Sequence, residues 1–225
     1  MRHQAADLYA VLMRVDIWSD VVCPWCYVGK ARFSKALGGF AHRDEVEVVY
    51  RSFELDPTRP SGDRQTVLEM LSQKYGMPPE QARQAEDRVA GLARAEGLDY
   101  SSDRPVGNTF GLHRVLHLGR EKGVQHDLLD AIYHAYFGEG RQIFDVPVAA
   151  AVAEKAGLDG PAVREVLGDE GRYADSVRAD EDEARRLGIT GVPFFVFDMA
   201  LGVSGAQPTE TLTQALEQAW SRAGE

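Results

Sequence analysis

The sequence has few cysteines and little positive charge. Only two of its 225 residues are cysteines, and 35 acidic residues outnumber 25 lysines and arginines, which gives a formal net charge of −10. A nucleic-acid-binding module normally carries a clustered basic face, so this charge disfavours binding to a phosphate backbone. The same acidic balance gives no signal for an anionic membrane surface.

Long hydrophobic runs are absent as well. No stretch of eighteen or more apolar residues occurs, and residues 1–18 lack an apolar segment followed by a small-residue cleavage site. We therefore expect a cytoplasmic protein, with residues 1–12 as an N-terminal extension. In a reducing compartment, two cysteines are more often catalytic or metal-binding than part of a disulfide framework.

What is present first is a βαβ pattern. Residues 14–18 alternate in polarity, residues 27–37 have helical spacing and end at a glycine pair, and residues 45–53 alternate again and are rich in valine and aromatic residues. The two strands are expected to pair in parallel, with a right-handed connection through the helix.

After Pro57 the pattern becomes helical. Strand signals return only at residues 193–198 and 201–204, which a C-terminal helix over residues 209–223 follows. The two halves must therefore come together to form one sheet. In the intervening block the spacing and the capping residues predict helices over residues 66–75, 78–96, 109–122, 127–138, 146–156, 161–167 and 173–187.

Both cysteines lie in the segment SDVVCPWCYVGKARF, at the junction of the first strand and the first helix. A redox cysteine needs a depressed pKa and an accessible sulfur, and a helix N-terminus favours an anion. Pro24 has no N–H group, so the amides of Trp25 and Cys26 are the donors expected at Cys23. Cys26, one turn further on, would be the more buried, resolving thiol.

Two other interpretations of the pair remain open at this point. Cys23 and Cys26 could be core residues, although packing poorly explains cysteines at the polar start of a helix. They could also bind zinc with His113 and His117, which are four residues apart on one predicted helical face.

A second motif, GITGVP, places Pro193 at the start of an apolar strand. Together with VVCPWC it resembles the thioredoxin superfamily, in which this proline is cis and packs beside the C-x-x-C motif. The finer pattern resembles the DsbA-like branch, in particular the FrnE family, which is related to 2-hydroxychromene-2-carboxylate isomerases and kappa-class glutathione transferases. The matching segments are DIWSDVVCPWCYVGKARF, YRSFELDP, NTFGLHRVLHL, GITGVPFFVF and GVSGAQP.

The resemblance implies an α/β, thioredoxin-like fold with a large all-helical insertion. Residues 13–57 and 176–225 would form the thioredoxin-like domain, and residues 58–175 the insertion. The implied activity is thiol:disulfide oxidoreduction of protein or small-thiol substrates, without a bound metal or other cofactor. Glutathione is the implied redox partner or cosubstrate, and the oligomeric state, monomer or homodimer, stays open.

The resemblance also assigns roles to single residues. Cys23 would attack and Cys26 would resolve the mixed disulfide, while Pro24 and Trp25 would contact the substrate. The backbone of Val192, ahead of Pro193, would pair with an extended substrate segment or with glutathione.

Four more places in the chain are candidates for the site. Asp16, in the first strand, is a candidate for proton transfer at the resolving cysteine, with an exposed strand-end aspartate as the alternative. Asn108 and His113 are candidates for the wall of the site, with a helix cap and a surface histidine as the alternatives. Residues 204–207 would line the glutathione side or form a polar turn.

An isomerase or transferase that uses glutathione is the second functional hypothesis. The related glutathione-using enzymes have a serine where this chain has Cys23, which favours thiol chemistry here. Trp25 takes the place of the histidine found in the strongly oxidising DsbA and supplies no positive charge. We therefore expect a Cys23 thiolate that is less stabilised than in DsbA, and a less oxidising couple.

Overall fold

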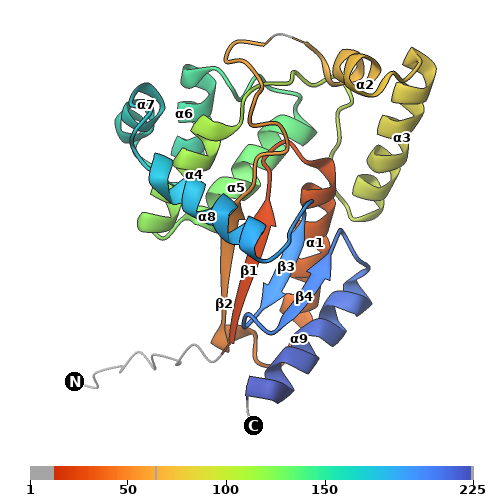
Figure 1. Cartoon of the computed structure of the whole chain (residues 1–225), viewed down its shortest axis with the longest axis vertical. Helices are drawn as coiled ribbons and strands as arrows, with labels where there is room; N and C mark the ends of the chain where they lie inside the picture. Colours follow the sequence, from red (N-terminus) through yellow and green to blue (C-terminus); the bar gives the residue numbers. More distant parts are fainter. Residues whose placement is uncertain (1–12, 64, 224–225) are drawn as a thin grey trace.

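The described part of the chain is built around one mixed β-sheet. The computed structural model describes residues 13–63 and 65–223, and within them four strands pair in the order β2-β1-β3-β4 (Figure 1). β1 and β2 are parallel, as expected, and β3 runs antiparallel to β1 and β4. The strands are β1 (Met13–Ser19), β2 (Val46–Ser52), β3 (Phe194–Phe197) and β4 (Leu201–Ser204).

The predicted helices are confirmed, with most ends within two residues. The first begins three residues earlier than expected, at Pro24, because CPWC forms its first turn. The helices are α1 (Pro24–Gly39), α2 (Val67–Tyr75), α3 (Pro79–Ala95), α4 (Phe110–Glu121), α5 (Gln125–Tyr133), α6 (Val146–Lys155), α7 (Gly160–Gly168), α8 (Ala174–Arg186) and α9 (Thr209–Ala223). A 3₁₀ turn spans Arg43–Glu45, and a π-helical turn, His134–Gly138, follows α5.

The expected α/β fold is confirmed, whereas the limits 58–175 for the insertion stay a prediction. Between β2 and α8 the chain forms α2 to α7, most of which lie beyond the carboxyl end of β1 (Figure 1). Residues 1–12, expected to be an extension, lie outside the described residues. Of the helices described, none combines the length and the apolar character that crossing a membrane requires.

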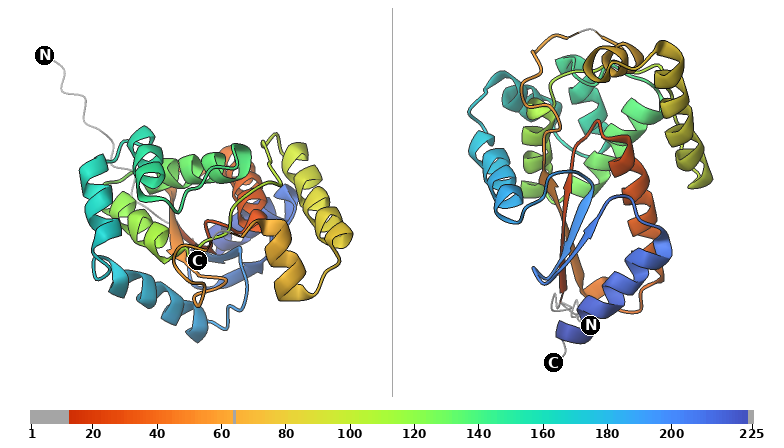
Figure 2. Two further views of the ribbon diagram at one scale, coloured as in Figure 1. Left: turned by 90° about the horizontal axis from the view of Figure 1, so that it is seen from above. Right: turned by 45° about the vertical axis from the view of Figure 1, so that its right-hand side comes forward.

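The two faces of the sheet are covered by different helices. α1 and α9 pack side by side on one face, and α8 packs on the other (Figures 1 and 2). Because successive side chains of a strand point to opposite faces, Val15 and Ile17 join the core under α1 and α9, whereas Trp18 packs towards α8. The Trp18 indole N–H donates to the backbone oxygen of Asp180 in α8 at 2.8 Å.

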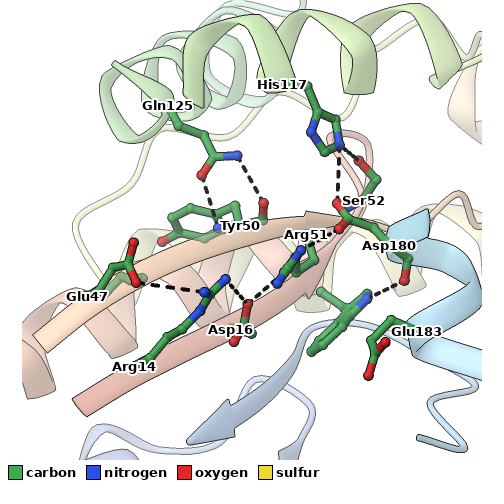
Figure 3. Close-up of polar contacts among 12 residues, drawn as sticks. Arg14, Asp16, Glu47, Tyr50, Arg51, Ser52, His117, Gln125, Asp180 and Glu183 are labelled. Carbon is green, nitrogen blue, oxygen red and sulfur yellow. Dashed lines mark hydrogen bonds and ion pairs between the residues drawn. The ribbon is translucent and has the colours of Figure 1, made fainter. Parts of the chain in front are cut away.

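Side chains from the helices pair with the free edge of β2. Gln125 of α5 accepts from the Tyr50 N–H at 3.1 Å and donates to the Tyr50 carbonyl at 3.0 Å (Figure 3). The Asp180 carboxylate accepts from the Ser52 N–H at 2.9 Å. Unpaired backbone groups at a buried edge would be costly, so these contacts fix α5 and α8 against the sheet.

A chain of charged side chains, with two buried carboxylates, continues from this edge across the sheet. Arg51 donates to Asp180 at 2.8 Å and to the Oδ1 of Asp16 at 2.6 Å, and Arg14 donates to the same Asp16 oxygen at 3.0 Å (Figure 3). Burial acts to raise the pKa of Asp180, but the hydrogen bonds from His117 and the Ser52 N–H and the charge of Arg51 outweigh it and lower that pKa. Asp180 is therefore ionised in the folded protein and stabilises it.

We expect Asp180→Asn to lower the free energy of unfolding at pH 7 by about 2 kcal/mol, because buried charge-assisted hydrogen bonds are lost. The folded-state pKa of Asp180 is depressed, so its contribution is complete above the unfolded-state pKa and is lost as pH falls through the folded value. Urea unfolding of both proteins between pH 7 and pH 3 should therefore show a difference that shrinks below about pH 4.

Asp182→Asn is the matched control for this prediction. Asp182 lies in the same helix, is half-exposed and pairs with the exposed Arg185. Its replacement should change stability little, since exposed ion pairs contribute about 0 to 1 kcal/mol. Equal losses in the two variants would contradict the role given to Asp180.

Candidate active site

The two cysteines form the first turn of α1. Cys23 is the N-cap residue, Pro24 is the first helical residue, and the Cys26 N–H donates to the Cys23 backbone oxygen at 3.0 Å. Both cysteines are free thiols and both are buried, with exposed fractions of 3% for Cys23 and 1% for Cys26. The pair is therefore one turn apart at a helix N-terminus, but Cys23 is more recessed than the expectation of an accessible sulfur implied.

The expected amide donors to Cys23 are not found. No N–H of α1 caps the Cys23 side chain, because the Cys26 amide is already used by the Cys23 backbone oxygen. The Cys23 thiol instead donates to the Val192 carbonyl, with an Sγ–O distance of 3.6 Å.

Cys26 is held as a thiol by its surroundings. Burial raises its pKa well above the usual range, and the hydrogen bond and the negative charge of Cys23 raise it further. The charge of Asp20 acts in the same direction, while a backbone hydrogen bond from Asp20 lowers the pKa. Cys26 must therefore lose its proton before it can act as a nucleophile.

Val192 and Pro193 bring the second half of the chain to the cysteines. The peptide bond between them is cis. Pro193 packs directly on α1 at Gly29, where a Cβ atom added to the glycine would lie 2.8 Å from the Pro193 Cγ. The Pro193 carbonyl accepts from the Gly205 N–H at 2.8 Å, which ties the start of β3 to the end of β4. Only glycine allows α1 to approach this closely.

A cavity of about 380 Å³ lies in front of Cys23. Cys23, Pro24 and Trp25 form one wall, residues 191–192 another, and side chains of α2 also line the cavity. Glu86 and Arg104, paired at 2.9 Å, line its inner end. Trp25, 44% exposed, is an apolar side chain at the mouth. Cys23 therefore lines a cavity of a size that can hold a small molecule.

Asp20 is a site residue that the sequence did not predict. It lies in the turn between β1 and α1, is buried and lines the cavity. Its carboxylate accepts from the Leu55 N–H at 2.8 Å and lies 3.4 Å from the His113 Nε2. The signal in the sequence was an acidic residue three positions before Cys23, in a segment without periodicity.

Comparison with known proteins now identifies the family. Residues 14–217 match the DSBA-like thioredoxin domain. The chain belongs to this DsbA-like family. A probable DsbA oxidoreductase from Streptomyces coelicolor is 59% identical in sequence, with a TM-score of 0.90 over 93% of this chain and 90% of that structure.

Two more distant proteins extend the comparison. The uncharacterized protein YwbO of Bacillus subtilis (strain 168) is 27% identical over 207 residues, which cover 91% of this chain and 96% of that protein. The cytosolic disulfide reductase DsbM of Pseudomonas aeruginosa, solved with GSH, is 18% identical, with a TM-score of 0.63 over 92% of this chain and 98% of that structure. At that identity the likeness concerns the fold.

Asp16 does not reach the cysteines of this DsbA-like domain. It is buried, not exposed at a strand end, and both of its cationic partners, Arg14 and Arg51, lie on the face of the sheet that α8 covers. Cys26 belongs to α1 on the opposite face. The strand alternation therefore excludes Asp16 from direct proton transfer at Cys26.

Asn108 and His113 lie behind the cavity wall. Asn108 accepts from the Phe110 N–H at 3.0 Å and donates to the Arg59 carbonyl at 3.0 Å, so it orders the start of α4 and the loop after β2. His113 is 1% exposed, not a surface histidine. Neither residue lines the cavity, but His113 contacts it through Asp20.

The four ligands of the zinc hypothesis do not form a group in the described part of the chain. His117 contacts Asp180 and the Ser52 hydroxyl, both at 3.2 Å, while His113 faces Asp20. Both histidines are buried, whereas one was expected to be exposed. Within the described ranges no three His, Cys, Asp or Glu side chains form a group that could hold a metal ion.

Residues 204–207 form a polar turn behind Pro193. The Gln207 side-chain amide donates to the Ser204 carbonyl at 2.8 Å, and Arg32 of α1 donates to the Ala206 carbonyl at 2.7 Å. None of these residues lines the cavity. The turn thus supports the Pro193 segment from the side away from Cys23.

We expect Gly29→Ala to destabilise the protein by about 1 to 3 kcal/mol, because the added methyl group overpacks the contact with Pro193. It should also slow alkylation of Cys23, because a displaced Pro193 also displaces Val192, whose carbonyl contacts the Cys23 thiol. Thermal unfolding and the alkylation rate measure the two effects. Gly38→Ala is the control: its Cβ meets open space, so it should stabilise the helix by about 0.5 to 1 kcal/mol.

Proposed function

We propose that this chain is a thiol:disulfide oxidoreductase in which Cys23 attacks and Cys26 resolves. The observation that carries the proposal is the position of the Cys23 thiol, which lines the cavity and lies 3.6 Å from the Val192 carbonyl. The sulfur thus lies where an incoming disulfide meets both a nucleophile and a backbone acceptor. The DsbA-like family and its disulfide oxidoreductase relatives agree with this chemistry.

In the reducing direction the Cys23 thiolate attacks one sulfur of a substrate disulfide. The substrate S–S bond breaks, one substrate sulfur leaves as a thiolate, and the other stays bonded to Cys23. Cys26 then loses its proton and attacks Cys23, which forms the Cys23–Cys26 disulfide and releases the second substrate thiol. Two electrons pass from the dithiol to the substrate, and the reverse sequence oxidises a substrate dithiol.

The Val192 backbone would align the substrate. In the resting dithiol its carbonyl accepts from the Cys23 thiol. Once Cys23 is a thiolate or a mixed disulfide, that acceptor is released. An extended peptide or the peptide bonds of glutathione can then pair with it, as in the addition of a single strand to a sheet edge.

Protein thiols and glutathione are both candidates for the substrate class. A cavity of about 380 Å³ accommodates a small thiol or the side chains flanking a cysteine in an extended segment. DsbM of Pseudomonas aeruginosa, a cytosolic disulfide reductase solved with GSH, supports glutathione as the partner and the cytoplasm as the compartment.

The reaction type is supported by Cys23 itself. Because this residue is a thiol, it favours thiol:disulfide exchange over the hypothesis of a glutathione-dependent isomerase or transferase. Assignment to the FrnE group stays a prediction.

Cys26→Ser should trap the substrate as a disulfide on Cys23, because the resolving thiol is missing. We expect mass spectrometry of the variant, purified from cells without reductant, to detect protein or peptide adducts at Cys23. Cys23→Ser is the matched control and should carry none. Glutathione as the sole adduct, together with isomerase turnover by the unaltered protein, would overturn the proposal in favour of the isomerase hypothesis.

Trp25→His should make the couple more oxidising. A histidine at this position adds a positive charge beside the Cys23 thiolate, which stabilises the reduced form. The reduction potential, measured against glutathione, should rise by tens of millivolts, since ~30 mV corresponds to ~1.4 kcal/mol for two electrons. Trp25→Gln is the uncharged control. The same rise in both variants would show that the charge is not the cause.

A further inference from the structure

The helix α2 presents one continuous stripe of side chains to the cavity in front of Cys23. The residues of α2 that line the cavity recur at the helical spacing i, i+3, i+4, i+7 and i+8, and they are Val67, Met70, Leu71, Lys74 and Tyr75. A stripe with this spacing usually packs against a protein core, but within α2 only Val67 is buried. The apolar part of the stripe therefore faces the cavity instead of a core.

Both ends of α2 are satisfied by residues next to it in the chain. At its start, the Thr66 hydroxyl accepts from the Glu69 N–H at 3.3 Å, and the Glu69 carboxylate accepts from the Thr66 N–H at 2.8 Å. This reciprocal pair is a capping box. At its end, Gly76 adopts the left-handed conformation, with a φ of 64°. The helix can therefore keep its own hydrogen bonds if it shifts as a unit.

The first turn of α2 is fixed by backbone hydrogen bonds. The Val67 N–H donates to the Arg104 carbonyl at 2.9 Å, and the Val106 N–H donates to the Gln65 carbonyl at 2.9 Å. These bonds form a short antiparallel bridge between residues 66 and 105. The bridge holds one end of α2 in place, while along its length the helix packs against α3.

An ion pair joins the other end of α2 to the loop after β2. The Lys74 Nζ donates to the Asp56 Oδ2 at 3.0 Å, and Arg59 donates to the same oxygen at 3.1 Å. All three side chains line the cavity. The loop is itself anchored, because the Asn108 side chain of the α4 start donates to the Arg59 carbonyl at 3.0 Å. The Lys74–Asp56 pair thus holds the last turn of α2 against a fixed loop.

This ion pair is weak enough to break and form again. The Lys74 and Asp56 side chains are 40% and 27% exposed. Ion pairs of such exposure shift an equilibrium by about 1.5- to 5-fold, and salt weakens them. The pair therefore favours one position of α2 without locking the helix in it.

The size of a substrate decides whether the position of α2 matters. Cys23 is 3% exposed, and the cavity that it lines has a volume of about 380 Å³. A volume of this order accommodates a small molecule. A disulfide within a polypeptide brings backbone and side chains on both sides of its sulfur, so it needs a wider cavity. Because α2 forms part of the wall, a shift of α2 changes that width.

We propose that the Lys74–Asp56 ion pair determines the size of the disulfide that Cys23 can attack. With the pair formed, the cavity admits small disulfides. With the pair broken, α2 moves about its fixed first turn, the cavity widens, and a polypeptide segment reaches Cys23 along the apolar stripe of the helix. This inference rests on the proposed function and adds a specificity-determining ion pair to it.

The test compares the reactions of the reduced protein with two disulfides. Glutathione disulfide is the small probe and insulin is the polypeptide probe. In each reaction the cysteine pair gives two electrons to the probe, whose disulfide is released as two thiols. Acid quenching and mass spectrometry give the rate at which the Cys23–Cys26 disulfide forms. The measured quantity is the insulin rate divided by the glutathione-disulfide rate, because this ratio cancels changes in the reactivity of Cys23 itself.

We expect Lys74→Gln to raise this ratio about two- to fivefold, the range that the loss of an exposed ion pair gives. Lys74→Glu should raise it further, since Asp56 then repels the end of α2. Lys74→Arg keeps the pair and should keep the ratio. Between about 0.05 M and about 0.5 M salt the ratio of the unaltered protein should also rise, and Lys74→Gln should lack most of this rise.

Lys122 is the matched control position. It is an exposed lysine that pairs with the neighbouring Glu121 at 2.9 Å, and it does not line the cavity. Lys122→Gln and Lys122→Glu change the net charge by the same amounts as the variants of Lys74. They should leave the ratio as it is in the unaltered protein.

A ratio in Lys74→Gln equal to that of the unaltered protein would overturn the inference. The same holds for an equal rise in the Lys122 variants, and for insulin that reacts with none of the proteins while glutathione disulfide does. Failure of the unaltered protein to react with either disulfide would instead contradict the proposed function, so the two failures are distinguishable.

Discussion

Side chains hydrogen-bond the free edge of β2, and this pairing positions the helices that build the site. A buried edge strand with unpaired N–H and C=O groups would lose about 1 to 3 kcal/mol for each. Gln125, His126 and Asp180 pair with successive outward-facing backbone groups of this strand. Because these side chains come from α5 and α8, they fix the helices against the sheet in one register.

That register carries α4 to the end of β1. α4 packs against α5, α7 and α8, so its position follows from theirs. His117 then contacts Asp180 beside the β2 edge, and His113, one turn earlier, meets Asp20 beside the cysteines. The helix α4 therefore contributes His117 to the charge network on the sheet and His113 to the candidate site. Both contacts stabilise the same position of α4.

The two cysteines are buried, and Cys23 lines the cavity. Both thiols are recessed, and the route to Cys23 passes a mouth with three exposed apolar side chains, Trp25, Leu55 and Tyr75. In the proposed reaction, a substrate would therefore have to bring its sulfur to Cys23 on a narrow segment. The close contact of Gly29 with Pro193 keeps the Val192 carbonyl beside that route.

The elements, and the place of the two cysteines at the start of α1, could be predicted from the sequence, because strand alternation, helix caps and the CPWC spacing are local signals. The same signals placed Asp16 in β1 but did not show which face of the sheet its side chain is on. Alternation puts Asp16 and Ile17 on opposite faces, but it does not say which face α1 covers. Asp20 had no periodic signal, and its partner His113 lies far along the chain. The contact between these two residues next to the cavity is a property of the folded chain, because the packing of α4 against α5 and α8 brings them together.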